Sequence, residues 1–568
     1  MLHQLCAEIA LHTISYLPLY SLYSAALVSR DWNALIAVNE ATVYRNAAIL
    51  HRFIVEDQLH AGSIPDSWKA YCRRQSEIER GWRGKAPSVV RELTATGTLV
   101  HRIKVDYELG FVITTCQIGG LFVCDIKSNR VLWALPPSHA VHYAHCEYDR
   151  RYIIFNRHDN CKEVWRCTVD ADGNRHPETS PPDQKMLEAS IQAASIFHSA
   201  ETHRGHFKAW ALLRVPETAR AFRFSYPTLL AAAMNNAYLW DVPSAQLVSV
   251  IRDIQQQHQG QSLATIKYVE VNDLYVFICG ARGLRIFGRE NGALLYQLST
   301  RELSSATWDV LPQTRGLASS VVHPQMLIHN LHSPSSIHGE FMACHVSASG
   351  NDLAVLTSHG RLIIFPDFPR LFTGSNVVHH RDITIVLNFQ PFSSDGDISY
   401  YLAMGDRNGK LAVATRRGIF LISPDFDFNR LTTDRPPEPG VSVCRLARFD
   451  HDRLLSSISC LQITHDGVYF TYKPCCASGG LDTDQHADQP DVEVFPVVDE
   501  DMEDGFADGW EDEDSDDEDL IGMGIAADGR YLGRLSSLVP VLMWSVDHAN
   551  INHWILPTDT NTVYSVTF

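Results

Sequence analysis

The sequence lacks the segments that would direct it into or across a membrane. It contains no apolar run of about 18 residues, so we expect no membrane-spanning helix. Its first residues, MLHQ, do not begin the basic and then apolar stretch that a secretion signal needs. The 13 cysteines show no paired spacing, which is typical of reduced thiols in an intracellular protein. We therefore expect a cytoplasmic or nuclear protein.

Motifs for metal binding and catalysis are also missing. Cys161 with Cys167, the pair at 475–476, and His379 with His380 do not have the spacing of zinc ligands. No glycine-rich phosphate loop follows a strand, and no serine or cysteine nucleophile motif is present. We therefore expect no metal, no cofactor and no catalytic residue, and an enzyme is the least favoured of the possible functions.

Negative charge is concentrated in one stretch. The formal net charge is −18, and 14 Asp and Glu residues lie between Asp499 and Asp519 without a Lys or Arg. The rest of the chain is close to neutral, so nothing marks it as a nucleic-acid binder. Like-charge repulsion predicts that residues 499–519 are extended and disordered. Three interpretations stay open: a docking site for a basic partner, an intramolecular occupant of cationic turns, and a tolerated loop insertion.

The first hundred residues have helical periodicity. Apolar residues recur every three or four positions from Leu5 onward. Pro18 separates two such segments, because proline disfavours the helical conformation of the residue before it, and Ser29 is a suitable N-cap for a third. We predict a small all-α bundle over residues 1–56, then a linker over 57–97 with an amphipathic helix from Ser67 to Trp82. On periodicity alone, the bundle is only a packing cap.

Particular residues of this bundle resemble an F-box. Glu8-Ile9, Leu17-Pro18 and the Val-Ser-Arg-Asp-Trp segment ending at Trp32 follow the order of that motif, although the family's opening Leu-Pro is Leu5-Cys6 here. In the family, the bundle inserts apolar side chains into the Skp-type adaptor of a cullin ligase. A bundle this small cannot cover all its apolar residues, and an exposed patch needs a partner. Carried over by position, the resemblance implies these adaptor contacts: Leu5, Ile9, Leu17, Pro18, Leu22, Val28 and Trp32.

Beyond the linker, the apolar pattern alternates with a period of two. One phrase recurs about every 40–75 residues: an apolar strand, a tight polar turn, and a second apolar strand. We predict an all-β propeller over residues 98–568, with six to eight blades and seven preferred, closed by Val563–Phe568 pairing with an early strand. The chain would then be α+β multidomain; the alternative is two β-sandwiches. The copies span 112–125, 152–167, 229–241 (with the Trp240-Asp241 dipeptide), 275–287, 353–365 and 411–422, with further candidates at 461–470 and 541–544.

The turns inside this phrase carry cations. In a propeller, the links between second and third strands all lie on one face, and here they hold Arg157, Arg282, Arg361, Arg416 and Arg417. A guanidinium group can hold a carboxylate or phosphate with two parallel hydrogen bonds. F-box/WD-repeat receptors often recognise acidic or phosphorylated segments on this face, so the resemblance implies that these arginines bind a target. The alternative is that they are solvated turn charges.

The linker helix also resembles the helix that joins F-box to propeller in F-box/WD-repeat proteins. The resemblance implies a non-catalytic, substrate-recognition subunit of an SCF-type ubiquitin ligase. The bundle would dock the Skp-type adaptor and, through it, a cullin, while the propeller binds a protein target, acidic or phosphorylated. We expect neither nucleic acid nor a membrane as partner. The alternative is a scaffold outside any ligase that holds a basic partner through residues 499–519.

Overall fold

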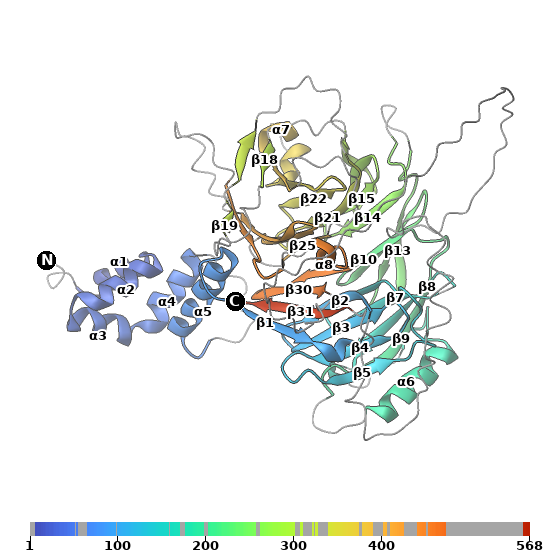
Figure 1. Ribbon diagram of the computed structural model, residues 1–568, viewed down its shortest axis with the longest axis horizontal. Coiled ribbons are helices and arrows are strands. Elements are labelled where there is room, and N and C mark those ends of the chain that lie inside the picture. Colours follow the sequence, from blue (N-terminus) through green and yellow to red (C-terminus); the bar gives the residue numbers. More distant parts are fainter. Residues whose placement is uncertain are drawn as a thin grey trace, which may run out of the picture. The chain divides into compact units, whose positions relative to one another are not determined.

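Among the described residues of the computed structural model, five α-helices come before the strands (Figure 1). Pro18 ends the first helix as expected, and the Ser29 and Ser67 side chains cap the third and fifth by accepting the backbone N–H of Trp32 and Ala70, each at 3.2 Å. The helices are α1 (Ala7–Ser15), α2 (Leu19–Val28), α3 (Arg30–Val38), α4 (Glu40–Leu50) and α5 (Trp68–Trp82). The structure describes residues 6–51, 53–54, 65–97, 99–157, 159–170, 176–197, 203–256, 262–300, 307–310, 321–322, 324–327, 339–373, 378–389, 401–405, 409–424, 440–449, 452–472 and 561–568.

The helix α5 contributes to two hydrophobic cores. At its start, Trp68 and Cys72 are buried in the core of α1–α4, together with Leu22, Ile36 and Val43. One further face of the same helix, formed by Ile78 and Trp82, is buried in a core cluster of the strands. A helix of 15 residues is about 22 Å long. The helical bundle is therefore joined to the strands by a continuous helix and not by a flexible linker.

The strands form seven sheets, which are the blades of a β-propeller. In the first six blades, four consecutive strands pair antiparallel. Blade 1 has β2 (Val100–Asp106), β3 (Phe111–Cys116), β4 (Leu121–Asp125) and β5 (Val131–Leu135); blade 2 has β6 (Cys146–Asp149), β7 (Tyr152–Asn156), β8 (Cys161–Cys167) and β9 (Phe207–Arg214); blade 3 has β10 (Ala221–Ser225), β11 (Thr228–Ala232), β12 (Ala237–Asp241) and β13 (Gln246–Ile251).

Blades 5 and 6 are widened by short additional strands. The strands β18 (Thr307–Asp309) and β20 (Gln325–Leu327) extend blade 5 beyond its outer strand, and β19 (Val321–Val322) extends blade 6. Blade 4 has β14 (Ile266–Val271), β15 (Tyr275–Gly280), β16 (Gly283–Gly288) and β17 (Leu294–Ser299); blade 5 has β21 (Phe341–Val346), β22 (Leu353–Thr357), β23 (Arg361–Phe365) and β24 (Ile385–Asn388); blade 6 has β25 (Tyr401–Met404), β26 (Leu411–Thr415), β27 (Gly418–Pro424) and β28 (Val441–Arg445).

The seventh blade combines strands from distant parts of the sequence. Its sheet has the order β1 (Val89–Leu93), β31 (Thr562–Thr567), β30 (Gly467–Tyr472) and β29 (Leu461–Ile463). The strand β31 pairs antiparallel with both β1 and β30, and Val563 lies opposite Leu93. Ring closure by the segment Val563–Phe568 with an early strand is therefore confirmed. The predicted linker over 57–97 ends earlier than expected, because β1 is already the outer strand of a blade.

The blades pack face to face because both sides of their middle strands are apolar. Every residue of β11, β22 and β26 is buried, so these strands read as continuous apolar runs, not as alternating ones. The helix α6 (Gln184–Ile196) covers the edges of blades 1 and 2, where Met186 joins the cluster of Trp133 and Phe207. The short helices are α7 (His380–Ile383) and α8 (Asp452–Leu455), with 3-10 turns at Thr94–Thr96, Thr168–Asp170 and Phe368–Leu371.

The repeated sequence phrase corresponds to one part of each blade. In blades 1–6 it is the second strand, a tight link and the third strand, and the predicted count of seven blades is confirmed. In blade 7 the phrase at 461–470 is the first and second strand instead, because the chain between β30 and β31 runs from residue 473 to 560. The candidate at 541–544 and the acidic stretch 499–519 lie outside the described residues.

The contact between α5 and blade 7 yields a test at Gly81. A methyl group there would lie 2.4 Å from Cβ of Phe568, whose ring packs against Trp82 with centroids 5.5 Å apart. Glycine to alanine inside a helix normally stabilises by about 0.5–1 kcal/mol. We expect Gly81→Ala to lower the free energy of unfolding by about 1 kcal/mol or more, in urea titrations followed by tryptophan fluorescence.

The matched comparison is Gly81→Ala in a Phe568→Gly background. Because that background has no Cβ at position 568, the substitution should there be neutral or stabilising. A stabilised Gly81→Ala single variant would contradict the packing of α5 on β31.

Candidate functional site

A chain of buried charges connects the inner strands of the propeller. Lys104 on β2 donates from Nζ to Glu147 on β6 at 2.8 Å, and Arg223 on β10 donates to the same Oε2 at 3.0 Å. Arg223 Nε also donates to Glu270 on β14 at 3.0 Å, and the other oxygen of Glu270 lies 3.0 Å from Nδ1 of His345 on β21. Five neighbouring blades are thereby connected through largely buried side chains, of which Arg223 is the most exposed at 22%.

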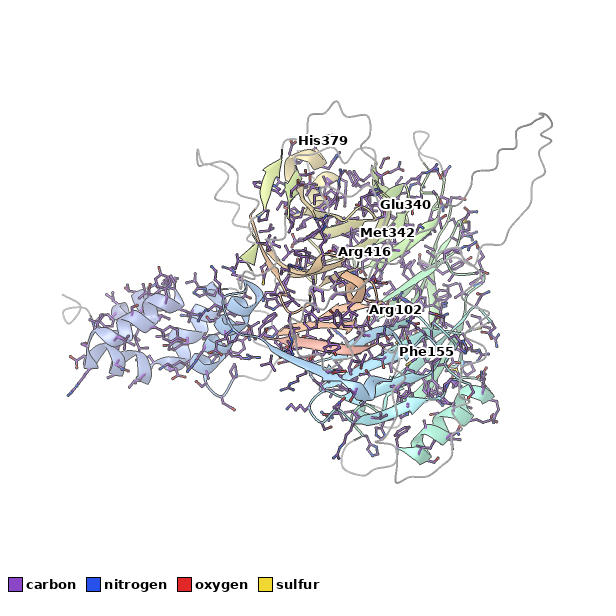
Figure 2. All side chains as sticks on the ribbon, in the orientation of Figure 1. Arg102, Phe155, Glu340, Met342, His379 and Arg416 are labelled. Atoms are coloured by element: carbon purple, nitrogen blue, oxygen red, sulfur yellow. The ribbon has the colours of Figure 1, made fainter. Side chains whose placement is uncertain are left out.

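Backbone carbonyls extend this chain to the two remaining blades. Nε2 of His345 lies 3.1 Å from the carbonyl oxygen of Leu402 on β25. On the other side, Arg102 on β2, labelled in Figure 2, donates to the carbonyl of Ser459, which precedes β29, at 2.8 Å. Arg102 also donates from Nε to Nδ1 of His145 at 3.2 Å. Polar contacts therefore run from the start of blade 7 through blades 1 to 5 and on to blade 6.

The ionisation of these groups follows from burial and pairing. Burial alone would raise the pKa of Glu147, but Lys104 and Arg223 outweigh it and hold that pKa well below its usual range. Glu270 behaves alike: burial alone would raise its pKa, but Arg223 outweighs the effect of burial, so the pKa is lowered. Both carboxylates are thus charged and already neutralised by cations of the ring. This network stabilises the propeller and offers no unpaired charge to a ligand.

Arg157, predicted to bind a target, is neutralised by its own chain. Its guanidinium group lies 2.6 Å from Asp183, 2.8 Å from Asp159 and 3.5 Å from the fully buried Glu163. Burial opposes the charged form, but the hydrogen bonds to Asp159 and Asp183 raise the pKa of Arg157 above its usual range. Asp183 also caps α6 by accepting the Met186 N–H at 3.0 Å. Arg157 thus holds blade 2 and α6 together, and its assignment to target binding stays a prediction.

The other predicted arginines differ in exposure. Arg282 and Arg416 are exposed, Arg417 is half-buried, and Arg361 is half-buried with a pKa lowered by burial despite the nearby Asp309. All four lie in or beside links between second and third strands, in blades 4, 5 and 6. Arg282 and Arg416, the latter labelled in Figure 2, are the two that present their side chains to solvent. The predicted ring of cations is therefore confined to one side of the propeller.

Sequence reasoning missed further cations on the same face. Neighbouring strands run antiparallel, so the link from the fourth strand of one blade to the first strand of the next lies at the same edge as the link between second and third strands. Arg220, Arg252 and Arg448 occupy such connections and are exposed. They could have been found by reading the links between blades as well as those inside the repeated phrase. The exposed arginines on these links are called the arginine face below: Arg220, Arg252, Arg282, Arg416 and Arg448.

The helix α5 contacts the opposite edge of the blades. Gln75 accepts a hydrogen bond from His465 at 2.8 Å, and Glu79 accepts one from Lys410 at 2.7 Å. His465 and Lys410 both lie in links between the first and second strands of their blades. The Lys410 ammonium group also lies over the Trp82 ring, 5.2 Å from its centroid. The helical attachment and the arginine face therefore use different edges of the propeller.

The helical bundle leaves large apolar side chains exposed. The helix α2 contains no charged residue, yet only Leu19 and Leu22 of its apolar side chains are buried. On its outer side Tyr20 is 72% exposed, Leu27 85% and Val28 72%, and Val38 at the end of α3 is 85% exposed. A helix that is apolar all round normally has partners all round. We refer to the exposed large apolar residues between Ala7 and Val38 as the bundle patch: Ile9, Tyr16, Tyr20, Leu27, Val28 and Val38.

The residues that the F-box resemblance assigned to adaptor contacts have different environments. Ile9 and Val28 belong to the bundle patch, while Leu17, Pro18 and Trp32 are half-buried. Leu22 is fully buried in the bundle core, which corrects its assignment as a contact: its side chain supports α2 from inside. Leu5 lies outside the described residues. The exposed residues Tyr16, Tyr20, Leu27 and Val38 were not among the predicted contacts. Helical periodicity alone does not tell which apolar residues of a helix are covered by its neighbours.

Within the described residues, no group of three or more His, Cys, Asp and Glu side chains is placed to hold a metal ion. None of the described helices is long and apolar enough to cross a membrane.

Comparisons with known proteins concern the fold. The WD40 repeats of RRP9 align with 67% of this chain and 89% of their own at 9% identity and a TM-score of 0.39. U3-55K aligns with 67% and 90% at 9% identity and the same TM-score, 0.39. The β-propeller domain of Cps50 (Swd1) from Myceliophteria thermophila aligns with 68% and 96% at 10% identity and a TM-score of 0.38. The sequence matches no protein-family model and no curated protein. The blade count therefore rests on the pairing of the strands.

Arg157 is paired inside the protein and Arg282 is exposed, so truncation of the two side chains should affect stability to different extents. Arg157→Ala removes the guanidinium group beside buried Glu163, which keeps His139 at 2.8 Å and the Trp165 N–H at 3.0 Å as partners, and we expect the free energy of unfolding to fall by about 2–3 kcal/mol in urea titrations. Arg282→Ala removes an exposed side chain and should change it by no more than about 0.5 kcal/mol. Equal effects of the two substitutions would show that Arg157 is not the internal anchor described here.

His145 predicts a loss of stability in mild acid. It donates from Nε2 to Glu147 at 2.9 Å, and burial lowers its pKa from 6.5 to about 4 despite that carboxylate. The unfolded chain therefore takes up a proton below about pH 6.5 that the folded chain refuses until about pH 4, so stability falls as the pH drops through this window. From pH 7.5 to 5.5, His145→Gln should lose about 1 kcal/mol less than the wild type in urea titrations. Identical losses would contradict this assignment.

Proposed function

We propose that this protein is a non-catalytic substrate-recognition subunit of an SCF-type ubiquitin ligase. The helical bundle docks on a Skp-type adaptor and the propeller holds a protein target. The ligase contributes the chemistry, and this chain contributes proximity, because a bound target lysine meets the ubiquitin-loaded enzyme at a high effective concentration. The observation that carries the proposal is the bundle patch, combined with the F-box sequence order in the same helices.

The bundle patch supports an obligate partner better than a packing cap. A cap would turn its apolar side towards the propeller, but the residues that contact the strands belong to α5, namely Ile78 and Trp82. The outer residues of α2 stay exposed in the presence of the described propeller strands. Clustered exposed apolar residues on a charge-free helix are typical of a protein interface.

The arginine face supports a target with carboxylates or phosphates. Its cations come from several links and lie at the blade edge that α5 does not contact. Arginine side chains in neighbouring links can bind one acidic or phosphorylated segment together through bidentate hydrogen bonds. A target bound to the arginine face would not use the residues of the bundle patch, so the same chain can bind target and adaptor together.

The alternative, a scaffold that binds a basic partner through residues 499–519, rests on the composition of that stretch alone. Deletion of residues 499–519 separates the two functions. The scaffold loses its basic partner after the deletion, whereas the receptor proposed here keeps both adaptor binding and the capture of an acidic target.

Binding of a purified Skp-type adaptor, measured by calorimetry with the full chain, tests the proposal. We expect Leu27→Asp combined with Val28→Asp to weaken binding at least about 100-fold, or about 2.7 kcal/mol. Both side chains are exposed, so folding should be unchanged. The matched control is Ile191→Asp on α6, an apolar side chain that is 71% exposed and lies outside the bundle. No adaptor binding by the wild type would refute the proposed function.

A further inference from the structure

A groove of about 550 Å³ lies between α2 and α5, beside the bundle patch. Its volume is within the range of ligand sites in proteins, about 300–1,000 Å³. Tyr23 forms its α2 side, and the other side is a stripe of α5. The stripe has three cations and one anion: Lys69, Arg73, Arg80 and Glu77. The groove therefore has a net positive lining in a protein whose overall charge is negative.

The cations of the groove are weakly engaged within the chain. Arg73 lies 3.1 Å from Glu77, but both side chains are largely exposed, at 76% and 48%, and such pairs contribute little. Arg80 donates to the carbonyl of Lys85 at 3.2 Å. Among the residues that the structure describes, no carboxylate forms an ion pair with the Lys69 ammonium group or the Arg80 guanidinium group, although the backbone N–H of Lys69 donates to Glu40 at 3.4 Å. Lys69, Arg73 and Arg80 can therefore bind an external anion without breaking a strong internal ion pair.

Tyr23, which lines the groove, carries a polar atom that lacks a partner. Oη of Tyr23 is buried and makes no hydrogen bond to any described residue. Burial raises the pKa of this phenol, so the hydroxyl keeps its proton and is a donor. A buried donor without an acceptor is costly, and an incoming acceptor would satisfy it. This orphaned hydroxyl belongs to a residue that lines the groove and is an observation independent of the cations on α5.

The spacing of the cations identifies the occupant. Lys69 and Arg73 are one helical turn apart and Arg80 follows two turns later, so the three span roughly 16 Å along α5. One phosphate group can reach only a fraction of this length. Successive carboxylates on one side of an extended segment recur about every 6.6 Å and can follow the whole row. The row therefore suits a segment with several acidic side chains.

We propose that this groove binds an acidic segment of the adaptor that docks on the bundle patch. Carboxylates of the segment pair with Lys69, Arg73 and Arg80, and one acceptor takes the Tyr23 hydroxyl. Tyr23 and the exposed residues Tyr20, Leu27 and Val28 belong to the same helix, so the groove continues the apolar docking surface as a charged margin. The inference rests on the proposed function and gives that interface its electrostatic component.

Calorimetric titration of the full chain with the purified adaptor, at 50, 150 and 300 mM NaCl, tests the inference. The triple variant Lys69→Glu, Arg73→Glu, Arg80→Glu should bind about 10–100-fold more weakly at 50 mM NaCl, and its affinity should depend less on salt, because the screened contacts are lost. The matched control reverses three exposed cations outside the bundle and outside the arginine face, Lys127→Glu, Arg130→Glu and Lys185→Glu, which changes the net charge equally. It should bind the adaptor like the wild type.

Tyr23→Phe separates binding from folding. Removal of a hydroxyl that has no partner should leave the free protein as stable as before or more stable, yet weaken adaptor binding about 3–10-fold, because the bound acceptor loses its donor. Unchanged affinity of the triple variant would overturn the groove while leaving the proposed function in place. No adaptor binding by the wild type would overturn both. A triple variant and a charge control that weaken binding equally would reduce the effect to net charge and also overturn the groove.

Discussion

The pairing of β31 with its two neighbours is the contact on which the remaining structure depends. This strand lies between β30 and β1, with Val563 opposite Leu93 and Thr567 opposite Val89. It completes the seventh blade, and the ring of charges from Arg102 to His345 needs that blade in place, since Arg102 donates to Ser459 beside it. The same pairing places Val566 and Phe568 against Trp82 of α5. Ring closure and the attachment of the helical bundle are therefore one structural event, not two.

Charged side chains of this protein divide into those that hold the fold together and those that remain for partners. Lys104, Arg223 and Arg157 are each paired with buried carboxylates of the same chain, so these charges are neutralised inside the protein. Arg282 and Arg252 on the propeller face, and Lys69 on α5, stay in contact with solvent. Exposed pairs contribute little to stability, whereas an unpaired exposed cation costs little to keep. The protein can thus vary its binding cations without disturbing the closure of its ring.

Much of the fold, but less of the site, could be predicted from the sequence. The blades were readable because the second and third strands are local, apolar and joined by tight turns, as at Leu411–Thr415 and Gly418–Pro424. The cap at Ser29 was readable because capping is a contact within three residues. The internal pairing of Arg157 could not be read from the sequence, because its partner Asp183 lies 26 residues away on another element. Likewise, Leu22 and Leu27 share one apolar helix, and only the packing of the other helices of the bundle decides which of the two is covered.

The distance in sequence between the partners of blade 7 has a consequence for biosynthesis. The Thr562 hydroxyl donates to the carbonyl of Leu93, 469 residues earlier, so the ring stays open on the ribosome until almost all of the blades have emerged. The helices α1–α4 are complete long before, and domains made first generally fold first. During that interval the propeller side of α5, with Ile78 and Trp82, has nothing to cover it. A nascent chain of this protein therefore exposes an apolar face of α5 that a chaperone can bind. That face becomes covered when the last blade of the propeller is completed.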